Sequence, residues 1–415
     1  MRKRLLLFAA TTGYQIRVFA EAARRLGVEL TLATDRCHVL DDPWGDQAVA
    51  VKFDHIEESL NALRGLACDG IAAVGDRPAV LAAEAARMLD VPFHPPAAAR
   101  ACHDKYLARQ LFRAAGLRVP WFFRARLAES VDPAAARATF PCVLKPLGLS
   151  ASRGVIRAND EAEFAAAFER IRAMLKESPD LRPAREQFLQ VEGYIEGREF
   201  AVEGLVTGGQ LRVLAIFDKP DPLEGPFFEE TLYVTPSREP AAVQQALGET
   251  TARAVKALGL LHGPVHAELR YNREGAWILE AAARPIGGLC ARTLRFEGNV
   301  PLEEMILRHA LGEDVSGLEL AGTASGVMMI PIPKGGVYES VEGVERAVQV
   351  AGIEDVLITA KEGQRLVPLP EGASYLGFVF ARGNSAGDVE QALRRSHSEL
   401  RFHIATALPT FSPSS

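Results

Sequence analysis

Two glutamates in the second half of the chain carry the clearest chemical signal. Glu268 lies in the alternating run 263–269, Glu280 ends the run 277–280, and the turn-forming residues 272–275 separate the two runs. The two acids stand an even number of positions apart, so we expect both carboxylates on one face of a β-hairpin. Carboxylates that converge among apolar residues need a cation between them, and oxygen-only ligands suit Mg²⁺ bound to phosphate oxygens. The alternative, two solvated acids on an edge hairpin, is disfavoured because Glu280 interrupts an otherwise apolar strand.

An arginine follows this hairpin, in a stretch that ends in a pair of glycines. The guanidinium of Arg284 can bind phosphate oxygens through two parallel hydrogen bonds and could hold a phosphoryl group during its transfer. We therefore assign Arg284 to catalysis and substrate binding, and Gly287 of the glycine pair to the substrate site.

A lysine and a glycine-rich loop form a second constellation. The run 140–146 reads as a short strand that carries Lys145 near its end, and the loop 147–155 that follows contains Ser150, Ser152 and Gly154 among other small residues. Backbone amides in such a loop can approach an anion closely, and a lysine beside it suits a polyphosphate. The loop is not a Walker A motif, because the lysine precedes the glycines. An ordinary loop with a solvated lysine is the open alternative.

A third constellation is the short connection at residues 192–199. Its backbone donors and acceptors at Glu192, Gly193 and Ile195 could read the flat edge of a base, and the carboxylate of Glu199 could accept ribose hydroxyls. The alternative is a surface turn with solvated acids.

The elements that must position these residues begin with an alternation of strands and helices. Apolar runs at 5–9, 28–33 and 71–74 predict strands, and helical spacing predicts helices at about 16–26 and 78–89. Such alternation predicts a parallel sheet. The basic and apolar start resembles a signal peptide, but the run ends at Thr11, so we interpret it as a buried first strand. The loop 11–15 lies where ligands collect in such sheets, although a plain tight turn is an equal alternative.

The fold class expected is therefore α/β plus α+β, in three domains. A proline-rich joint at 91–96 ends a parallel α/β domain over 1–95. A two-lobed domain over 96–300 follows, with a lid at about 140–190, and a C-terminal α+β unit spans 301–415. Single helices are expected over 97–115 and 161–176.

Composition excludes several classes of protein. The chain has 415 residues, of which 48 % are hydrophobic and 24 % charged, as in an average globular protein. A net charge of −6 gives no general attraction to nucleic acid, and no apolar run reaches the ~18–20 residues that a membrane helix needs. The five cysteines are scattered without C-x-x-C spacing, which favours a reducing, cytoplasmic location.

Taken in order, these motifs resemble the ATP-grasp superfamily over roughly residues 1–300. The resemblance implies a pre-ATP-grasp domain over 1–95 and an ATP-grasp domain over 96–300. Asp104 and Lys105, at a helix start, resemble the first nucleotide-binding lysine motif of the family, and Lys145 the second. The glycine-rich loop resembles the family's phosphate-covering loop, residues 192–195 resemble its adenine-binding segment, and Glu199 resembles its ribose-binding acid. Glu268 and Glu280 resemble its paired magnesium-binding acids, and Arg284 resembles the arginine that stabilises the transition state.

One position departs from the family pattern. The second metal-binding acid is often followed by a metal-binding asparagine in Glu-x-Asn, but Glu280 is followed by two alanines, Ala281 and Ala282. A glutamate without that asparagine is similar to the L-amino-acid ligases, or dipeptide synthases, and the motifs at 217–220, 227–237 and 368–383 also resemble that subgroup. By this likeness Glu230 lies near a substrate amine and Lys219 near phosphate as a catalytic residue.

The resemblance implies an ATP-dependent carboxylate–amine ligase that forms an amide or peptide bond through an acyl phosphate. It implies ATP and Mg²⁺, or Mn²⁺, as cofactors, with small-molecule carboxylate and amine substrates, an amino acid among them. No nucleic-acid or membrane partner is expected, and a homodimer is the base-rate expectation.

Two other functions are kept as alternatives. A biotin-carboxylase-like carboxylase would need a separate carrier protein, because no Met-Lys pair occurs in the chain. A non-catalytic ATP-binding regulatory protein is disfavoured by the presence of both magnesium acids. His266 has no partner acid at a fixed sequence spacing, and we interpret it as a satisfied structural histidine rather than a general base.

Overall fold

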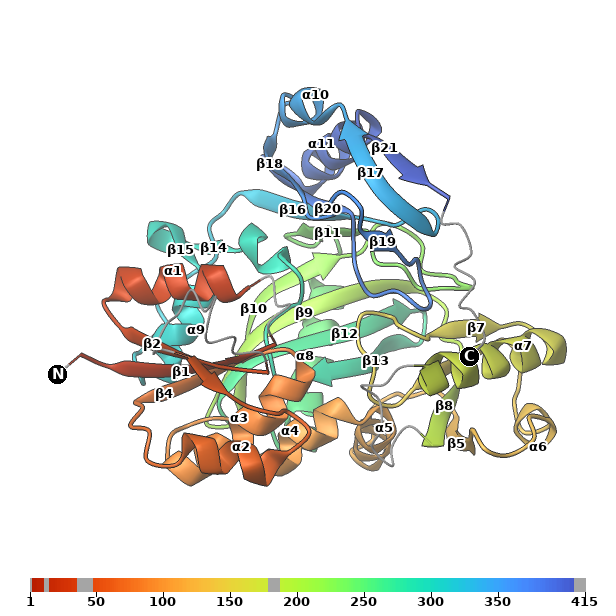
Figure 1. The fold of residues 1–415 in the computed structure, drawn as a ribbon, viewed down its shortest axis with the longest axis horizontal. Coiled ribbons are helices and arrows are strands. Elements are labelled where there is room, and N and C mark those ends of the chain that lie inside the picture. The colour runs from red at the N-terminus through yellow and green to blue at the C-terminus, as the bar shows by residue number, and fades with distance from the viewer. Residues whose placement is uncertain (1, 11–14, 36–47, 178–186, 407–415) are drawn as a thin grey trace, which may run out of the picture. The chain divides into compact units, whose positions relative to one another are not determined.

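A computed structural model describes residues 2–10, 15–35, 48–177 and 187–406 (Figure 1). Most of the predicted ligand loop 11–15, and Cys37, lie outside these ranges. The chain divides into two compact units. The first comprises Met1–Val119, Ile195–Asp218 and Pro236–Gly322, and the second Pro120–Tyr194, Lys219–Thr235 and Thr323–Ser415. Within the described ranges, no helix has the length and apolar character needed to cross a bilayer.

The first unit begins with the expected parallel sheet. Strands β1 (Arg4–Ala9), β2 (Glu29–Thr34), β3 (Ala48–Ala50) and β4 (Gly70–Val74) lie in the order β3-β2-β1-β4, and every pair is parallel. Residues 5–9 of β1 are buried on both faces, as a continuous apolar run requires. Helices α1 (Ile16–Leu26), α2 (Ile56–Leu63) and α3 (Asp76–Leu89) complete this part, and α9 (Leu302–Ala310) packs against α1 and β4.

The single helix predicted over 97–115 is wrong, because the chain breaks at Asp104 into α4 (Pro96–His103) and α5 (Lys105–Ala114). Asp104 has an extended backbone, and its carboxylate accepts hydrogen bonds from the backbone N–H groups of Tyr106 and Leu107, each at 3.0 Å. This is the geometry of a helix N-cap, which satisfies amides that the first turn leaves without partners. The break makes Lys105 the first residue of α5.

The first unit also contains antiparallel strands that pair side by side (Figure 1). Their order is β13 (Gly275–Ala282), β12 (Gly263–Asn272), β9 (Arg198–Thr207) and β10 (Gln210–Asp218). Helix α8 (Ala241–Leu258) packs on one face, where Val202, Leu269 and Ile278 join the hydrophobic core. The opposite face carries the charged residues described below.

The second unit contains a four-stranded sheet in the order β5-β8-β6-β7. Its strands are β5 (Phe122–Arg126), β8 (Phe188–Gly193), β6 (Cys142–Pro146) and β7 (Ile156–Ala158). Helix α7 (Glu161–Glu177) packs against β6 and β7, close to the helix predicted at 161–176, and α6 (Asp132–Ala135) is a single turn beside it.

The second unit also contains the C-terminal α+β elements. Strands β11 (Leu232–Thr235), β16 (Ala324–Ile330), β20 (Gly377–Gly383) and β18 (Ile353–Ile358) follow one another in a sheet, against which α11 (Ala386–Ser398) and α10 (Val344–Val348) pack. Strands β19 (Arg365–Leu366), β17 (Gly336–Glu342) and β21 (Arg401–Ala405) form a separate small sheet.

Candidate active site

Glu268 on β12 and Glu280 on β13 lie directly opposite each other in the strand register. They do so because of a β-bulge. Paired residues next to the turn, such as Leu269 and Ile278, are an odd number of positions apart in the sequence. The register shifts by one residue between Leu269 and Glu268, so Glu268 pairs with Glu280 at an even separation. Ile278 therefore points into the hydrophobic core while Glu280, two positions later, lies opposite Glu268 on the charged face. The even number of positions between the two glutamates does not by itself predict this bulge.

Cationic side chains surround the two glutamates. Lys105 Nζ lies 3.6 Å from a Glu280 carboxylate oxygen, and His266 Nε2 lies 3.6 Å from a Glu268 oxygen. Burial acts to lower the pKa of Arg284, but the charges of Asp76, Glu280 and Glu268 outweigh it and raise that pKa. The structure thus brings Lys105, Arg284 and both predicted metal ligands into one electrostatic neighbourhood of the first unit.

Arg284 is held by a residue that the sequence analysis missed. Its Nε donates to Asp76 Oδ1 at 2.8 Å, and its Nη2 donates to Asp76 Oδ2 at 3.3 Å. Burial alone would raise the pKa of Asp76, but the charge and hydrogen bonds of Arg284 hold it at about 2. Asp76 begins α3 just after β4, and the carboxyl end of a parallel strand is the signal that could have drawn attention to it.

His266 is a satisfied buried histidine, as expected, and its partners are two acids. Its Nδ1 lies 3.1 Å from a carboxylate oxygen of Glu203, which is fully buried, and its Nε2 faces Glu268. Burial would lower the pKa of His266, but the hydrogen bonds to Glu203 and Glu268 raise it to about 9. Sequence spacing could not reveal Glu203, because only the pairing of β9 with β12 places it opposite His266.

Glu203 also fixes the loop that follows Arg284. Both of its oxygens accept the backbone N–H of Ile286 at 3.2 Å, and the Ile286 carbonyl accepts Gln15 Nε2 at 2.6 Å. The peptide next to Gly287 is therefore clamped from both sides, which orients the segment assigned to the substrate.

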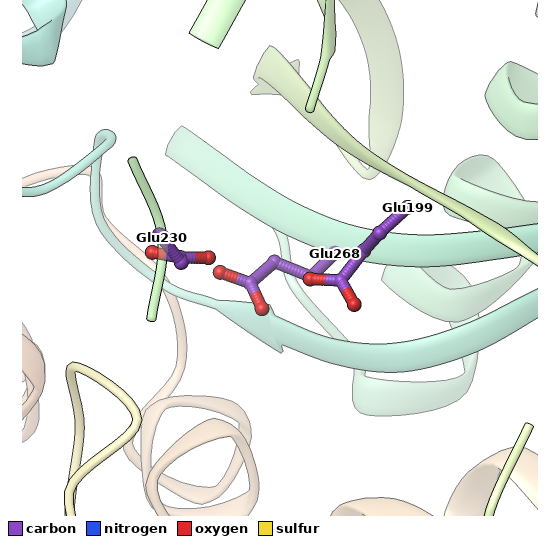
Figure 2. Close-up of side chains that lie close together, drawn as sticks. All are labelled: Glu199, Glu230 and Glu268. Carbon is purple, nitrogen blue, oxygen red and sulfur yellow. The ribbon is translucent and has the colours of Figure 1, made fainter. Parts of the chain in front are cut away.

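Glu199 lies beside Glu268 on the adjoining strand (Figure 2). Carboxylate oxygens of the two residues approach within 4.8 Å of each other. Arg270 lies opposite Glu199 and donates from Nε to Glu199 at 2.9 Å and from Nη1 to the Ile195 carbonyl at 2.6 Å. Arg270, which the sequence analysis missed, thus links the predicted ribose acid to the predicted adenine-binding connection. Glu230, also labelled in Figure 2, belongs to the second unit.

Lys145 and Glu192, predicted to contact different parts of the nucleotide, form a buried ion pair between β6 and β8 of the second unit. Gln190 Nε2 also donates to Glu192 at 2.5 Å. At the neighbouring Gly193, an added Cβ would lie 2.7 Å from Trp121 Nε1, so this position needs glycine. The ion pair thereby holds the ammonium group of Lys145 in place.

The glycine-rich loop adopts left-handed backbone conformations at two residues that are not glycine as well as at Gly154. Ala151, Ser152 and Gly154 have positive φ angles of 55°, 54° and 71°. The Gly154 N–H donates to the Pro370 carbonyl at 2.8 Å. The loop that carries Ser150 and Ser152 is therefore anchored at one end by the C-terminal part of the same unit.

Lys219 and Glu230 form an ion pair in the second unit. Tyr233 Oη donates to the same Glu230 oxygen at 2.9 Å, and Lys219 Nζ lies 5.0 Å from the centre of the Tyr233 ring. Lys219 is only 2 % exposed while Glu230 is 17 % exposed, so the carboxylate is the more accessible member.

Two parts of the chain match described protein families. Residues 138–293 match the ATP-grasp domain, and residues 328–405 match the L-amino acid ligase C-terminal domain 2. The chain therefore contains an ATP-grasp domain over residues 138–293. Residues 328–405 form a domain of the kind described for L-amino acid ligases, and the two domains together are those of an ATP-grasp carboxylate–amine ligase.

Two individual relatives match part or most of the chain. An uncharacterized protein of Sinorhizobium fredii, y4rH, is 24 % identical over 417 residues, covering 98 % of this chain and 84 % of that protein. Dapdiamide A synthase of Enterobacter agglomerans is 30 % identical over 155 residues, which cover 37 % of this chain and 35 % of that protein.

Solved structures show the same fold. The L-amino acid ligase of Bacillus licheniformis superposes with a TM-score of 0.80 at 23 % identity, covering 98 % of this chain and 99 % of that one. The biotin carboxylase domain of Hydrogenobacter thermophilus 2-oxoglutarate carboxylase, a dimer in complex with MgADP, ADP and bicarbonate, has a TM-score of 0.70 at 15 % identity and covers 97 % of this chain and 91 % of that one.

Proposed function

We propose that this chain uses ATP to convert the carboxylate of an amino acid into an acyl phosphate and then joins it to the amine of a second substrate. The observation that carries the proposal is the opposed pair of Glu268 and Glu280 with Lys105 and Arg284 beside it. Phosphoryl transfer needs mainly positioning and charge neutralisation, and this cluster supplies both.

The two acids fit Mg²⁺, with Mn²⁺ as an alternative, because they offer only carboxylate oxygens from a rigid hairpin. Bound there, the ion would neutralise phosphate charge. Ala282 stands opposite His266 in the register, at the position where the family often has a metal-binding asparagine. The remaining coordination positions therefore fall to phosphate and water.

Nucleotide binding is proposed for nine residues, which are charged side chains or members of the glycine-rich loop and the adenine-binding connection. They are Lys105, Lys145, Ser150, Ser152, Gly154, Glu192, Gly193, Ile195 and Glu199. Lys105 and Lys145 neutralise phosphates, and the carboxylate of Glu199, oriented by Arg270, accepts a ribose hydroxyl.

We retain the division into domains at 1–95, 96–300 and 301–415 as part of the proposal.

The reaction proceeds in two balanced steps. A carboxylate oxygen of the first substrate attacks the γ-phosphorus, and the bond to the bridging oxygen breaks to release ADP. The amine nitrogen then attacks the acyl carbon, loses a proton, and expels phosphate. Arg284 stabilises the transferring phosphoryl group, Gly287 lies next to the substrate, Glu230 binds a substrate ammonium group, and Lys219 holds Glu230 in place and supplies positive charge near the phosphate.

A phosphate-release screen of carboxylates crossed with amines tests this proposal, with mass spectrometry of the products. We expect ADP formation that depends on one carboxylate and one amine, with an amide product. Stimulation by bicarbonate and free biotin instead would support the carboxylase alternative. Nucleotide binding without phosphate release across the whole screen would support a regulatory role. The homodimer stays a prediction that light scattering can test.

A further inference from the structure

The chain between β10 and β11 belongs to the second unit, although it follows directly from a strand of the first. We call residues 219–231 the substrate segment, because they carry Lys219 and Glu230. How this segment is attached within its unit determines how Glu230 moves relative to the glycine-rich loop.

Arg157 on β7 is one point of attachment, in addition to the bridge between Ile156 and Phe227 and the ion pair of Asp221 with Arg394. The Nη1 of Arg157 donates to the Glu224 carbonyl at 2.7 Å, and its backbone N–H donates to the Pro226 carbonyl at 2.9 Å. Between these residues Gly225 has a φ of 98°, and an added Cβ there would lie 2.9 Å from Arg157 Cβ. The arginine stem therefore packs directly on the backbone of the substrate segment.

The guanidinium of Arg157 also contacts the adenine-binding connection. It lies 4.1 Å from the centre of the Tyr194 ring, and that ring stacks on Phe228 with centroids 6.4 Å apart. A cation over an aromatic face is attracted by the negative charge of the ring's π-system. One side chain thus joins β7, the adenine-binding connection and the substrate segment.

A small hydrophobic cluster reinforces this attachment. Leu223 and Phe228 of the substrate segment pack with Val143, Val155 and Tyr194. Val143 lies on β6, the strand of Lys145, and Val155 follows Gly154 directly. The elements that carry the phosphate-binding residues are therefore the same ones that hold the substrate segment.

We propose that Arg157 is a positioning residue that makes the substrate segment and the glycine-rich loop respond to nucleotide as one body. This inference rests on the proposed function, because it assigns nucleotide to one part of the body and substrate to the other. Such a common response would couple nucleotide binding to substrate binding, because the acyl phosphate would form only when Glu230 is already placed to hold the substrate. Without the coupling, water can hydrolyse the activated carboxylate and ADP is released without product.

Hydrogen exchange measured by mass spectrometry tests the inference on the full chain with and without MgADP. In the wild type we expect MgADP to slow exchange in both 145–158 and 221–230. In R157A the second region should exchange at least about tenfold faster without nucleotide and gain no protection from MgADP, while 145–158 still does. R137A is the matched control, because Arg137 lies 4.1 Å over the Phe123 ring in the same unit. R157K, which keeps the charge but not the planar fork, should recover part of the response.

The outcomes separate this inference from the proposed function. If region 221–230 of R157A responds to MgADP as in the wild type, the inference is overturned. If MgADP protects 145–158 but not 221–230 in the wild type, the inference fails and nucleotide binding stands. If MgADP protects neither region, both fail. Once a substrate pair is known, R157A should release several-fold more ADP per product with an unchanged KM for ATP, and an unchanged ratio would contradict the coupling.

Discussion

Asp76 and Arg284 form a two-point ion pair although 208 positions of sequence separate them. Asp76 begins a helix of the parallel α/β part, and Arg284 follows the last strand of the antiparallel sheet. The proposed transition-state arginine is thus oriented by a part of the fold to which the sequence analysis assigned no catalytic role. Its side chain is 12 % exposed, so its direction is set before substrate binds.

D76N should lower kcat for ATP turnover by about 10–100-fold and change the KM for ATP less, because the arginine loses its orienting charge. Steady-state kinetics measure this. D54N is the matched control, since Asp54 pairs with Arg77 on the surface. D76E, which keeps the charge, should retain more activity than D76N. Equal kcat values for D76N and D54N would show that Asp76 does not orient Arg284 for catalysis.

E280A should reduce ADP formation by at least about 100-fold while circular dichroism stays unchanged, because one of the two proposed metal ligands is lost. E274A, in the exposed turn of the same hairpin, is the control and should keep near-normal turnover. EDTA should stop turnover of the wild type, and added Mg²⁺ should restore it. Near-normal ADP release by E280A would show that the metal assignment is wrong.

G154A should lower the free energy of unfolding by about 1–3 kcal/mol and slow turnover. Its φ is 71°, and an added Cβ would lie 2.6 Å from Met174 Cε and 2.7 Å from Pro146 Cγ. G363A controls for backbone strain alone, since Gly363 has a φ of 77° and no atom within 4 Å of the added Cβ. Urea unfolding monitored by fluorescence compares the two variants, and equal losses would show that the close packing of the loop is unimportant.

Acid should destabilise the first unit through His94. Burial lowers its pKa to about 4, and its ring nitrogens bond the Leu261 N–H and the Pro264 carbonyl. The unfolded chain has a histidine pKa near 6.5, so it binds the proton first, and the stabilisation present above pH 6.5 is lost as the pH falls towards 4. The loss approaches about 3 kcal/mol.

Urea midpoints between pH 7 and pH 4.5 check this effect, with H94N as the comparison. H94N should be less stable at pH 7 and lose less of its stability on acidification. Parallel profiles for the two proteins would mean that His94 does not titrate in this way.

The sequence predicted the elements that are determined by residues close together in the chain. The buried strand β1, the helix ended by Gly27 and the hairpin with its turn at 272–275 follow from periodicity and turn chemistry. The break at Asp104 is also local, and the helix start assigned to Asp104 and Lys105 by resemblance was correct where the prediction of one helix over 97–115 was not.

The relations between distant strands could not be predicted. Glu203 meets His266 only because β9 pairs with β12 in one register, and Arg270 meets Glu199 for the same reason. The bulge that turns Glu280 towards Glu268 depends on how Ile278 packs in the core, which spacing does not encode. Sequence patterns thus indicated the kinds of residue that we propose for the site, while the register determined their partners.

Oxygen-isotope transfer tests the central claim most directly. A pool of L-amino acids labelled with ¹⁸O in their carboxyl groups is incubated with the protein, ATP and Mg²⁺, and the released phosphate is analysed by mass spectrometry. Attack of the carboxylate on the γ-phosphorus, followed by attack of the amine on carbon, predicts phosphate that carries one ¹⁸O for each amide formed. Amide formation with unlabelled phosphate, or no ATP consumption with any labelled amino acid, would contradict the account.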